Sequence, residues 1–116
     1  MEEKMKDSSV EEKIYELHAE LCSVLSHPQR LKILNLLRDK EKSVKELLVK
    51  LRINKANLSQ HLAIMRKQRI VSTRREGVSI YYHLSNPKML KACDTIRDAL
   101  FEQLNENNQL LKKYKK

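Results

Sequence analysis

The sequence predicts a mostly α-helical fold with one small β-hairpin, in the order of four helices, two strands and a fifth helix. Apolar side chains recur every three or four residues in several stretches, which is the periodicity of amphipathic helices. The only glycine, Gly77, separates two short β-like runs. We expect a single domain over residues 1–116, because a chain of this length has no room for a second hydrophobic core. Residues 1–8 and 112–116 are expected to be flexible tails.

The ends of the expected helices are set by capping residues and prolines. Pro28 and Pro87 each follow a short polar pair and fit the first turn of a helix, where no backbone N–H is needed. Ser43, with Glu46 three residues later, predicts a capping box, and Asn54 predicts the cap of the following helix. The five helices are expected over residues of about 9–25, 28–39, 44–51, 55–68 and 89–111.

The third helix, the fourth helix and the hairpin together form a known supersecondary unit. Only residues 52–54 separate the two helices, as in a helix-turn-helix, which would span residues 43–68. The hairpin follows directly over residues 70–84, with its turn at residues 75–77. A helix-turn-helix followed by such a wing predicts a winged helix-turn-helix fold.

The positive charge of the chain is concentrated in its middle. The formal net charge of +9 divides into −4 for residues 1–20, +10 for residues 21–85 and +3 for residues 86–116. Residues 50–75 contain eight bases and no acid. A solvated helix face normally mixes both signs, so this segment indicates a polyanionic partner. Together with the fold, it predicts binding to double-stranded DNA.

Composition argues against several other classes of protein. No apolar run approaches the ~18–20 residues that span a bilayer, and the charged N-terminus has no apolar signal segment, so we expect a cytoplasmic protein without membrane contact. Cys22 and Cys93 lie 71 residues apart, which fits neither a disulfide scaffold nor a zinc knuckle. The sequence has no glycine-rich phosphate loop, no paired-acid motif and no nucleophile with a matching base. We therefore expect neither an enzyme nor a bound cofactor.

Four linked motifs resemble those of the ArsR family of bacterial and archaeal repressors. They are LSHPQRLKIL at residues 25–34, SVKEL at 43–47, LSQHL at 58–62, and REG at 75–77 with IYYHL at 80–84. The resemblance implies a transcriptional repressor that binds an inverted-repeat operator as a homodimer built on its first and last helices. It also implies release of the operator when a metal, metalloid or sulfur species acts on the protein.

The fourth helix is expected to read the DNA from one of its two faces. Leu58, Leu62 and Met65 lie on the face expected in the core. Small, amide and basic side chains near the helix N-terminus fit a major groove, and the bases before the wing turn suit phosphate or minor-groove contact. The expected DNA-contact residues are Lys55, Ala56, Asn57, Ser59, Gln60, Arg74 and Arg75. The alternative for all of them is plain solvated surface.

Three further side chains on these elements have two interpretations each. His61 lies nearer the core-facing side of its helix, which favours a packed, hydrogen-bonded histidine over a base-reading one. Tyr81 and Tyr82 alternate across their strand. We expect one of the two tyrosines in the core and the other at the surface or at a phosphate.

Two apolar stripes, over residues 10–25 and 89–111, predict a homodimer. Both are longer than one subunit can cover, and exposing them would leave an apolar patch above the few hundred Å² usual on monomers. A two-fold dimer would bury them and place two recognition helices about one DNA turn, roughly 34 Å, apart.

The ligands of the sensor sites known in the ArsR family are missing at the corresponding positions. Residues 46–50 contain no cysteine where the family has a Cys-x-Cys pair. Asn86 and Lys88 stand where an acid and a histidine open the last helix, and Asn35 and Phe101 stand where a sulfur-sensing branch has cysteines. We therefore assign no metal site, and the effector stays unknown.

Cys22, Cys93 and His18 are the remaining candidate sensor residues. His18 and Cys22 are four residues apart and share one side of the first helix, while Cys93 lies in the apolar stripe of the last helix. If these helices meet in a dimer, the three side chains could form a disulfide or bind a soft metal or metalloid. The alternative, which two cysteines without a motif favour, is a pair of buried core residues.

Two other functions stay open at this stage. A winged-helix module could use its basic surface to bind an acidic protein partner, although a protein surface rarely needs twenty-six residues without an acid. RNA binding is the weaker option, because one phenylalanine and four tyrosines offer few stacking platforms.

Overall fold

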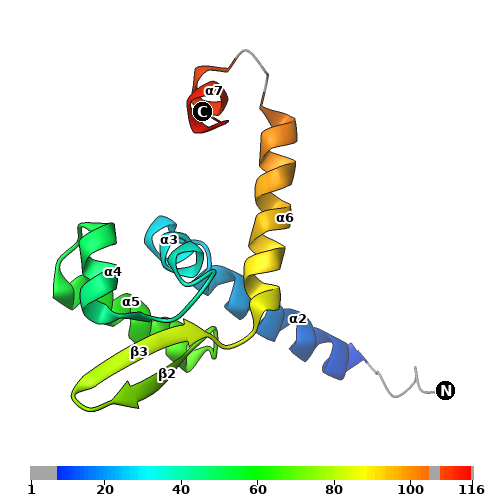
Figure 1. Ribbon diagram of the computed structural model, residues 1–116. Helices are drawn as coiled ribbons and strands as arrows, with labels where there is room; N and C mark the ends of the chain where they lie inside the picture. The colour runs from blue at the N-terminus through cyan, green and yellow to red at the C-terminus, as the bar shows by residue number, and fades with distance from the viewer. Residues whose placement is uncertain (1–7, 105–107, 116) are drawn as a thin grey trace. The chain divides into compact units, whose positions relative to one another are not determined.

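The computed structural model describes residues 8–104 and 108–115 (Figure 1). It divides the chain into two compact units, one ending at Ser85 and one beginning at Asn86. From residue 8 onward, where it is described, the first unit contains a small sheet and four helices: α2 (Ser8–Val24), α3 (Pro28–Leu36), α4 (Val44–Leu51) and α5 (Lys55–Lys67). The mostly helical fold, the order of these helices and the hairpin after them are confirmed.

The core of the first unit is made by the apolar faces of α3, α4 and α5 and by the start of the hairpin. Leu58 and Met65 are fully buried and Leu62 nearly so, which confirms the inward face expected for α5. The eight largest fully buried side chains have an exposure of about 2 % or less; they are Ile33, Leu34, Leu47, Leu58, Leu62, Met65, Ile70 and Val71. Burial of eight such side chains fixes how α5 lies against its neighbours, because each contributes about 1.5–3 kcal/mol relative to exposure.

Both caps of the helix-turn-helix form as expected. The Ser43 side chain accepts a hydrogen bond from the Glu46 backbone N–H at 3.1 Å, and the Glu46 carboxylate accepts one from the Ser43 N–H at 2.8 Å. The Asn54 side chain accepts from the Asn57 N–H at 2.7 Å and begins α5. Between the two helices, Arg52 adopts the left-handed conformation (φ 57°) that ends α4.

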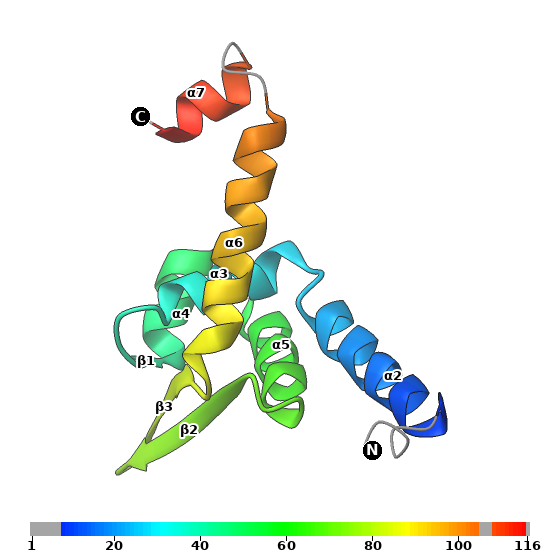
Figure 2. The same ribbon diagram turned by 90° about the vertical axis from the view of Figure 1, so that its right-hand side faces the viewer.

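The wing consists of β2 (Val71–Glu76) and β3 (Ser79–Leu84), paired antiparallel (Figure 2). Glu76 pairs with Ser79, so the loop contains only Gly77 and Val78 and begins two residues later than expected. Gly77 has a φ of +63°, which suits the first central position of a hairpin turn and is costly for other residues.

A third strand, β1 (Lys42–Ser43), was not expected from the sequence. It pairs antiparallel with β3, Lys42 opposite Tyr82 and Ser43 opposite Tyr81, giving the strand order β1-β3-β2. The strand has two residues and no pattern of its own. It exists because the capped start of α4 lies beside the wing.

The second helix ends three residues earlier than expected, at Leu36. Leu37 leaves the helical region with ψ of 6°, and the Arg38 guanidinium then donates two hydrogen bonds, 3.0 and 2.8 Å long, to the Asn35 side chain. The sequence has no glycine or proline near Leu36 to mark the end of the helix. The apolar run that ends at Leu37 therefore led to a predicted helix that is too long.

The second unit contains two helices, α6 (Pro87–Gln103) and α7 (Gln109–Lys115), and the single helix expected over 89–111 is wrong. Leu104 takes an extended conformation (φ −83°, ψ 139°) that ends α6. The Asn108 side chain accepts from the Leu110 N–H at 2.8 Å and begins the new helix. Asn107, part of the predicted stripe, lies outside the described residues.

Both ends of the described chain are helical, and the flexibility of residues 1–8 and 112–116 stays a prediction. Ser8 already belongs to α2, and the helix α7 continues to Lys115. Within α7, Leu111 is buried and the ring of Tyr114 lies 5.3 Å from that of Phe101 in α6. These apolar side chains therefore pack α7 against α6.

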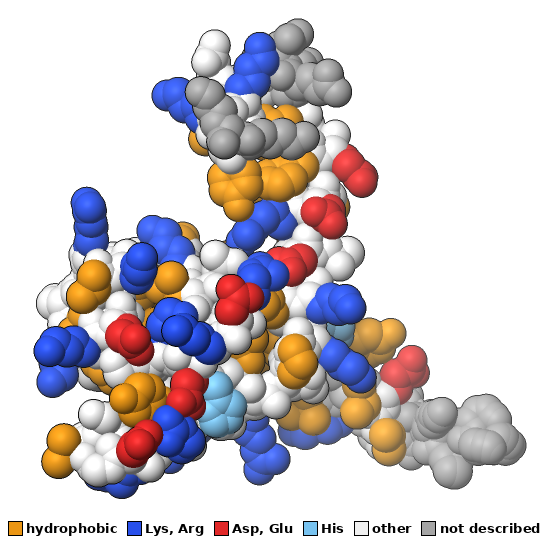
Figure 3. All heavy atoms as spheres, viewed as in Figure 1, with side chains coloured by type: hydrophobic (Ala, Val, Ile, Leu, Met, Phe, Trp, Pro, Cys, Tyr) orange, Lys and Arg blue, Asp and Glu red, His pale blue; other side chains and the backbone are white. Residues whose placement is uncertain are grey.

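Apolar side chains are exposed along α2 and α6. On α2, Val10, Ile14 and Leu17 are 50%, 58% and 49% exposed, and Figure 3 shows hydrophobic side chains open along this helix. On α6, Ile96 and Leu100 are 69% and 48% exposed. In the described part of the chain, no helix combines the length and apolarity needed to cross a membrane.

Candidate nucleic-acid interface

The N-terminal half of α5 presents a row of exposed side chains. The five residues expected to contact DNA on this helix, Lys55, Ala56, Asn57, Ser59 and Gln60, are all exposed. Leu58, between them in sequence, is fully buried and holds the helix in place. The first turn contains no acid, so the positive end of the helix dipole and Lys55 make this end of α5 positive. The geometry suits a base-reading surface, and DNA contact by these residues stays a prediction.

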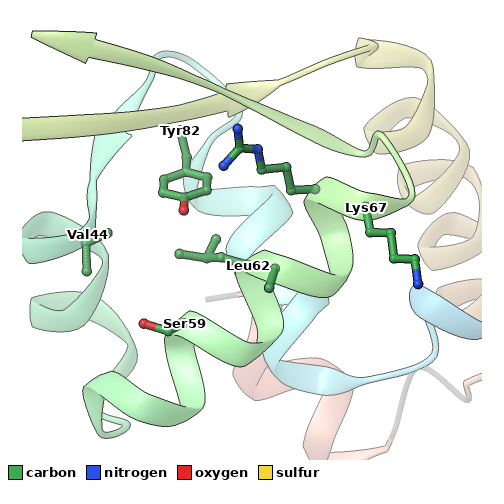
Figure 4. Close-up of a pocket in the computed structure, with 7 residues that line it drawn as sticks. Val44, Ser59, Leu62, Lys67 and Tyr82 are labelled. Carbon is green, nitrogen blue, oxygen red and sulfur yellow. The ribbon is translucent and has the colours of Figure 1, made fainter.

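A groove runs along α5, between this helix, the start of α4 and strand β3 (Figure 4). It consists of two hollows of about 420 and 700 Å³ that share Val44, Ser59 and Tyr82. Figure 4 shows the Tyr82 hydroxyl pointing into the first hollow toward Leu62, with the Ser59 hydroxyl at its edge. The groove therefore has an apolar floor and hydroxyl groups within reach of a bound chain.

Basic side chains line both ends of this groove. Lys45 and Lys55 lie at the end near the wing, and Arg66 and Lys67 lie at the end near the C-terminus of α5. Glu46 is the acid among the described lining residues, and its carboxylate is held in the capping box, where the Ser43 backbone N–H lowers its pKa. Arg66 and Lys67 were not among the expected contact residues, although the acid-free run over residues 50–75 contains them.

The two wing arginines have different surroundings. The Arg74 guanidinium donates to both oxygens of Glu41 and, at 2.9 Å, to Glu76, and it lies 4.9 Å from the centre of the Tyr81 ring. The hydrogen bond to Arg74 lowers the pKa of Glu41, and the two carboxylates raise the pKa of Arg74. Arg75 is exposed, and its side chain makes a 3.4 Å hydrogen bond to the Gly77 carbonyl near the turn.

The expected roles of the two tyrosines are met only in part. Both tyrosines line the groove, but Tyr81 also lies against the Arg74 guanidinium and only Tyr82 lines the first hollow, so their surroundings differ in part. Both are half-buried, however, and neither is a core residue. They share this exposure with the whole of β3, the central strand, in which every residue is half-buried.

His61 is packed and hydrogen-bonded, as expected. Its Nδ1 atom accepts a 3.1 Å hydrogen bond from the Arg30 Nε–H, and its ring lies edge-on to that of His27, with centroids 4.6 Å apart. Partial burial lowers the pKa of His61, and the neighbouring His27 and Arg30 lower it further.

The candidate sensor residues are distributed over both units. His18 and Cys22 are exposed on α2, and Cys93 is half-buried on α6. The alternative that both cysteines are buried core residues is wrong for Cys22, which is exposed in the single subunit. Among the described residues, no three His, Cys, Asp or Glu side chains form a cluster that could hold a metal ion. Convergence of the three candidates across a dimer stays a hypothesis.

The capped helix pair, the exposed face of α5 and the adjoining wing define a winged helix-turn-helix protein. The model for "Bacterial regulatory protein, arsR family" matches residues 27–73, from the start of α3 into β2. The chain belongs to the arsR family of transcriptional regulators, as the relatives described next also show.

The chain is similar to several regulators over most of its length. It is 34% identical over 101 residues to the HTH-type transcriptional regulator Rv0081 of Mycobacterium tuberculosis, covering 86% of this chain and 89% of that protein. It is 37% identical to the transcriptional repressor PagR of Bacillus anthracis, covering 72% and 84%. The transcriptional activator HlyU of Vibrio cholerae is also 37% identical, with coverage of 74% and 79%.

Solved structures of two of these relatives have the same fold. The crystal structure of Rv0081 superimposes with a TM-score of 0.70 at 35% identity, covering 75% of this chain and 88% of that one. A structure of HlyU gives a TM-score of 0.67 at 36% identity, covering 79% and 99%. The fold class expected from the sequence is confirmed.

Proposed function

We propose that this protein is a sequence-specific DNA-binding regulator that acts as a homodimeric repressor on an inverted-repeat operator. The observation that carries the proposal is the continuous surface formed by the N-terminal half of α5 and the basic groove beside it. On α5 the exposed side chains of that surface are small, amide or basic, and the Glu46 carboxylate in the groove is held in a cap.

Base recognition is assigned to the exposed face of α5. Ala56 and Ser59 are small enough to let the helix enter a major groove about 12 Å wide. Gln60 can make two hydrogen bonds to adenine, and Lys55 can reach guanine. Asn57 is an additional polar contact in the first turn, where its own N–H is already held by the cap.

Backbone binding is assigned to the groove and the wing. Lys45, Arg66 and the Tyr82 hydroxyl line a path that a phosphodiester strand could follow from the wing along α5. Arg75 is exposed beside the turn and suits a phosphate or the minor groove. Arg74 belongs to the same surface, but its charge is largely balanced by Glu41 and Glu76, so we assign it the smaller contribution.

The homodimer is supported by the apolar side chains left open on α2 and α6. Ile14 and Ile96 are among the most exposed apolar residues of the chain, and covering them in a two-fold contact would remove them from water. The repressor sense follows the similarity to PagR, whereas the similarity to HlyU makes activation the alternative. A promoter fusion measured with and without the gene distinguishes the two.

The effector response is proposed for the two cysteines. Cys22 is exposed near the end of α2, with His18 one turn before it, so a thiol oxidant or a soft metal ion can reach both. We propose that such a reagent, acting on Cys22 and Cys93, releases the DNA. Release that is unchanged in Cys22→Ser and Cys93→Ser variants would show that neither thiol is the sensor.

The central experiment is a footprint on duplexes that the protein selects from a random-sequence pool. We expect two protected half-sites about one helical turn apart, and binding that weakens by roughly 10³–10⁵-fold between 50 and 200 mM salt if 6–10 phosphates are neutralised. Selection of no common sequence, with tight binding to an acidic protein instead, would favour the alternative of a protein-interaction module.

A further inference from the structure

One arginine side chain in the first unit connects three helices. Arg30 lies in the first turn of α3, and its Nη1–H donates a 3.1 Å hydrogen bond to the carbonyl oxygen of Val24, the last residue of α2. Its Nε–H donates the 3.1 Å hydrogen bond to Nδ1 of His61 on α5. Both contacts are partly buried, so they are better protected from water than a surface pair.

The hydrogen bond to His61 is compatible with one protonation state only. Arg30 has donors and no acceptor, so Nδ1 of His61 must carry a lone pair, and the imidazole must be neutral with its proton on Nε2. A proton on Nδ1 would remove the acceptor and place a cation against the guanidinium. The neighbouring His27 touches the His61 ring, but within the described residues its buried Nδ1 has no hydrogen-bond partner. His27 therefore makes no second hydrogen bond through Nδ1 that could hold His61 in place.

We propose that Arg30 is a positioning residue that ties the end of α2 to the recognition helix α5, and that protonation of His61 breaks this tie and weakens DNA binding. The inference rests on the proposed function of α5 as the DNA-reading helix. In the described part of the chain, the ionisable groups that act on His61 are His27 and Arg30, and α2 contributes the Val24 carbonyl. The burial that lowers the pKa of His61 agrees with a neutral ring at pH 7.

The tie links two surfaces with different proposed roles. α2 carries the exposed apolar stripe and Cys22, whose carbonyl oxygen accepts hydrogen bonds from the Leu25 N–H and the Ser26 hydroxyl in the turn after the helix. A change in this last turn of α2 also moves the Val24 carbonyl, and so reaches Arg30 and α5. Through this contact, α2, which we propose to lie in the dimer interface, is connected to α5, which we propose to read the DNA.

The test needs a variant that keeps the acceptor and does not titrate. His61→Asn places an amide oxygen near the position of Nδ1 and stays neutral at all relevant pH values. This control is needed because protonation of other histidines adds positive charge and tightens DNA binding at low pH. Arg30→Lys is the second variant, since an ammonium cannot reproduce the two-directional fork of the guanidinium.

The first measurement is an NMR titration of the free protein from pH 8 to pH 5.5. We expect the amide signals of Leu25 and Ser26, after α2, to shift with the titration of the His61 ring, together with amides of α5. In His61→Asn and Arg30→Lys this common transition should disappear while the spectra stay those of a folded protein. If the Leu25 and Ser26 amide signals of the wild type do not shift as His61 titrates, the proposed coupling between α2 and α5 is wrong.

The second measurement is the affinity for a duplex selected from a random pool at pH 8. Between pH 8 and pH 5.5 we expect the wild type to lose about two- to fivefold in affinity relative to His61→Asn, the loss at pH 5.5 that a pKa difference of about one unit between bound and free protein produces. Identical pH profiles for the two proteins would overturn the inference. If the wild type selects no sequence at pH 8, the proposed function is wrong, and the NMR titration still decides whether Arg30 couples α2 to α5.

Discussion

Glu41 and Arg74 form a two-point ion pair that fastens the outer strand of the wing to the segment before β1. Arg74 Nε lies 3.0 Å from one carboxylate oxygen of Glu41, and the other oxygen accepts from Nη2. The residues are 33 positions apart, and the paired guanidinium also lies over the ring of Tyr81. The wing is thus held in place by a residue that also belongs to the proposed DNA-binding surface.

The first prediction concerns the charge that this pair neutralises. In Glu41→Gln the guanidinium loses its two-point partner and becomes available to phosphate, so we expect DNA affinity at low salt to rise by roughly two- to fivefold. The thermal midpoint should change little, because the pair is solvent-exposed. Fluorescence anisotropy with a selected duplex measures the first effect and circular dichroism the second.

The pH dependence of this pair has a defined sign. The pKa of Glu41 in the folded protein is lowered, so the stability that the pair contributes is present above pH 4.5, its ordinary value, and is lost as pH falls through the folded pKa. Wild type and Glu41→Gln should therefore converge in thermal midpoint below that range. A difference that grows toward acid pH would contradict the assignment of the pair.

The second prediction separates the two wing arginines. Arg75→Gln should weaken binding to all duplexes and reduce the slope of log K against log salt by about 1, because one phosphate contact is lost. Arg74→Gln should have the smaller effect, since its charge is already balanced by two carboxylates. Lys113→Gln, an exposed change on α7, is the control for net charge alone. Equal losses for Arg75→Gln and Lys113→Gln would remove Arg75 from the interface.

The third prediction separates base reading from backbone binding. Gln60→Ala should relax sequence preference at one position of each half-site, with a loss of about 1–3 kcal/mol of discrimination there. Arg66→Gln, in the groove, should weaken binding evenly across sequences and leave the preference intact. Selection from a random pool, repeated with each variant, gives both readouts. A changed consensus with Arg66→Gln would show that the groove reads bases.

The fourth prediction uses the His61 ring as a stability probe. The pKa of His61 is lowered in the folded protein, so the unfolded chain binds its proton more readily in acid. The stability associated with the neutral ring is fully present above pH 6.5, the ordinary value, and is lost as pH falls through the folded pKa. Urea unfolding between pH 8 and pH 5 should show a steeper loss for the wild type than for His61→Asn. Parallel curves would mean that the ring does not titrate differently on folding.

The fifth prediction addresses the exposed stripes. Ile14→Glu on α2 and Ile96→Glu on α6 should each shift the protein toward monomer, because a charge cannot be buried in an apolar contact without a partner. Val49→Glu on α4 is the matched control, since Val49 is 72% exposed outside both stripes. Analytical ultracentrifugation measures the association. A dimer that survives both stripe variants would place the subunit contact elsewhere.

The sequence by itself determined the helix-turn-helix and the wing. Their boundaries depend on contacts within three or four residues: the Ser43–Glu46 box, the Asn54 cap and the positive φ at Gly77. Such local signals are readable because the partner side chain is close in the chain. The inward and outward faces of α5 followed from helical periodicity for the same reason.

The tertiary structure decided what depends on residues far apart or on backbone conformation that periodicity does not register. Apolar spacing continues through Leu104, although the backbone there is extended, so the pattern alone joined α6 and α7 into one helix. Strand β1, the groove along α5 and the partners of Arg74 and Arg30 arise only when α3, α4 and the hairpin pack together. Arg30 and His61 are 31 positions apart, and no local rule relates them. The sequence therefore specified which face of α5 is exposed and which is buried, while packing over long separations determined which charges beside it are paired and how the helix is held.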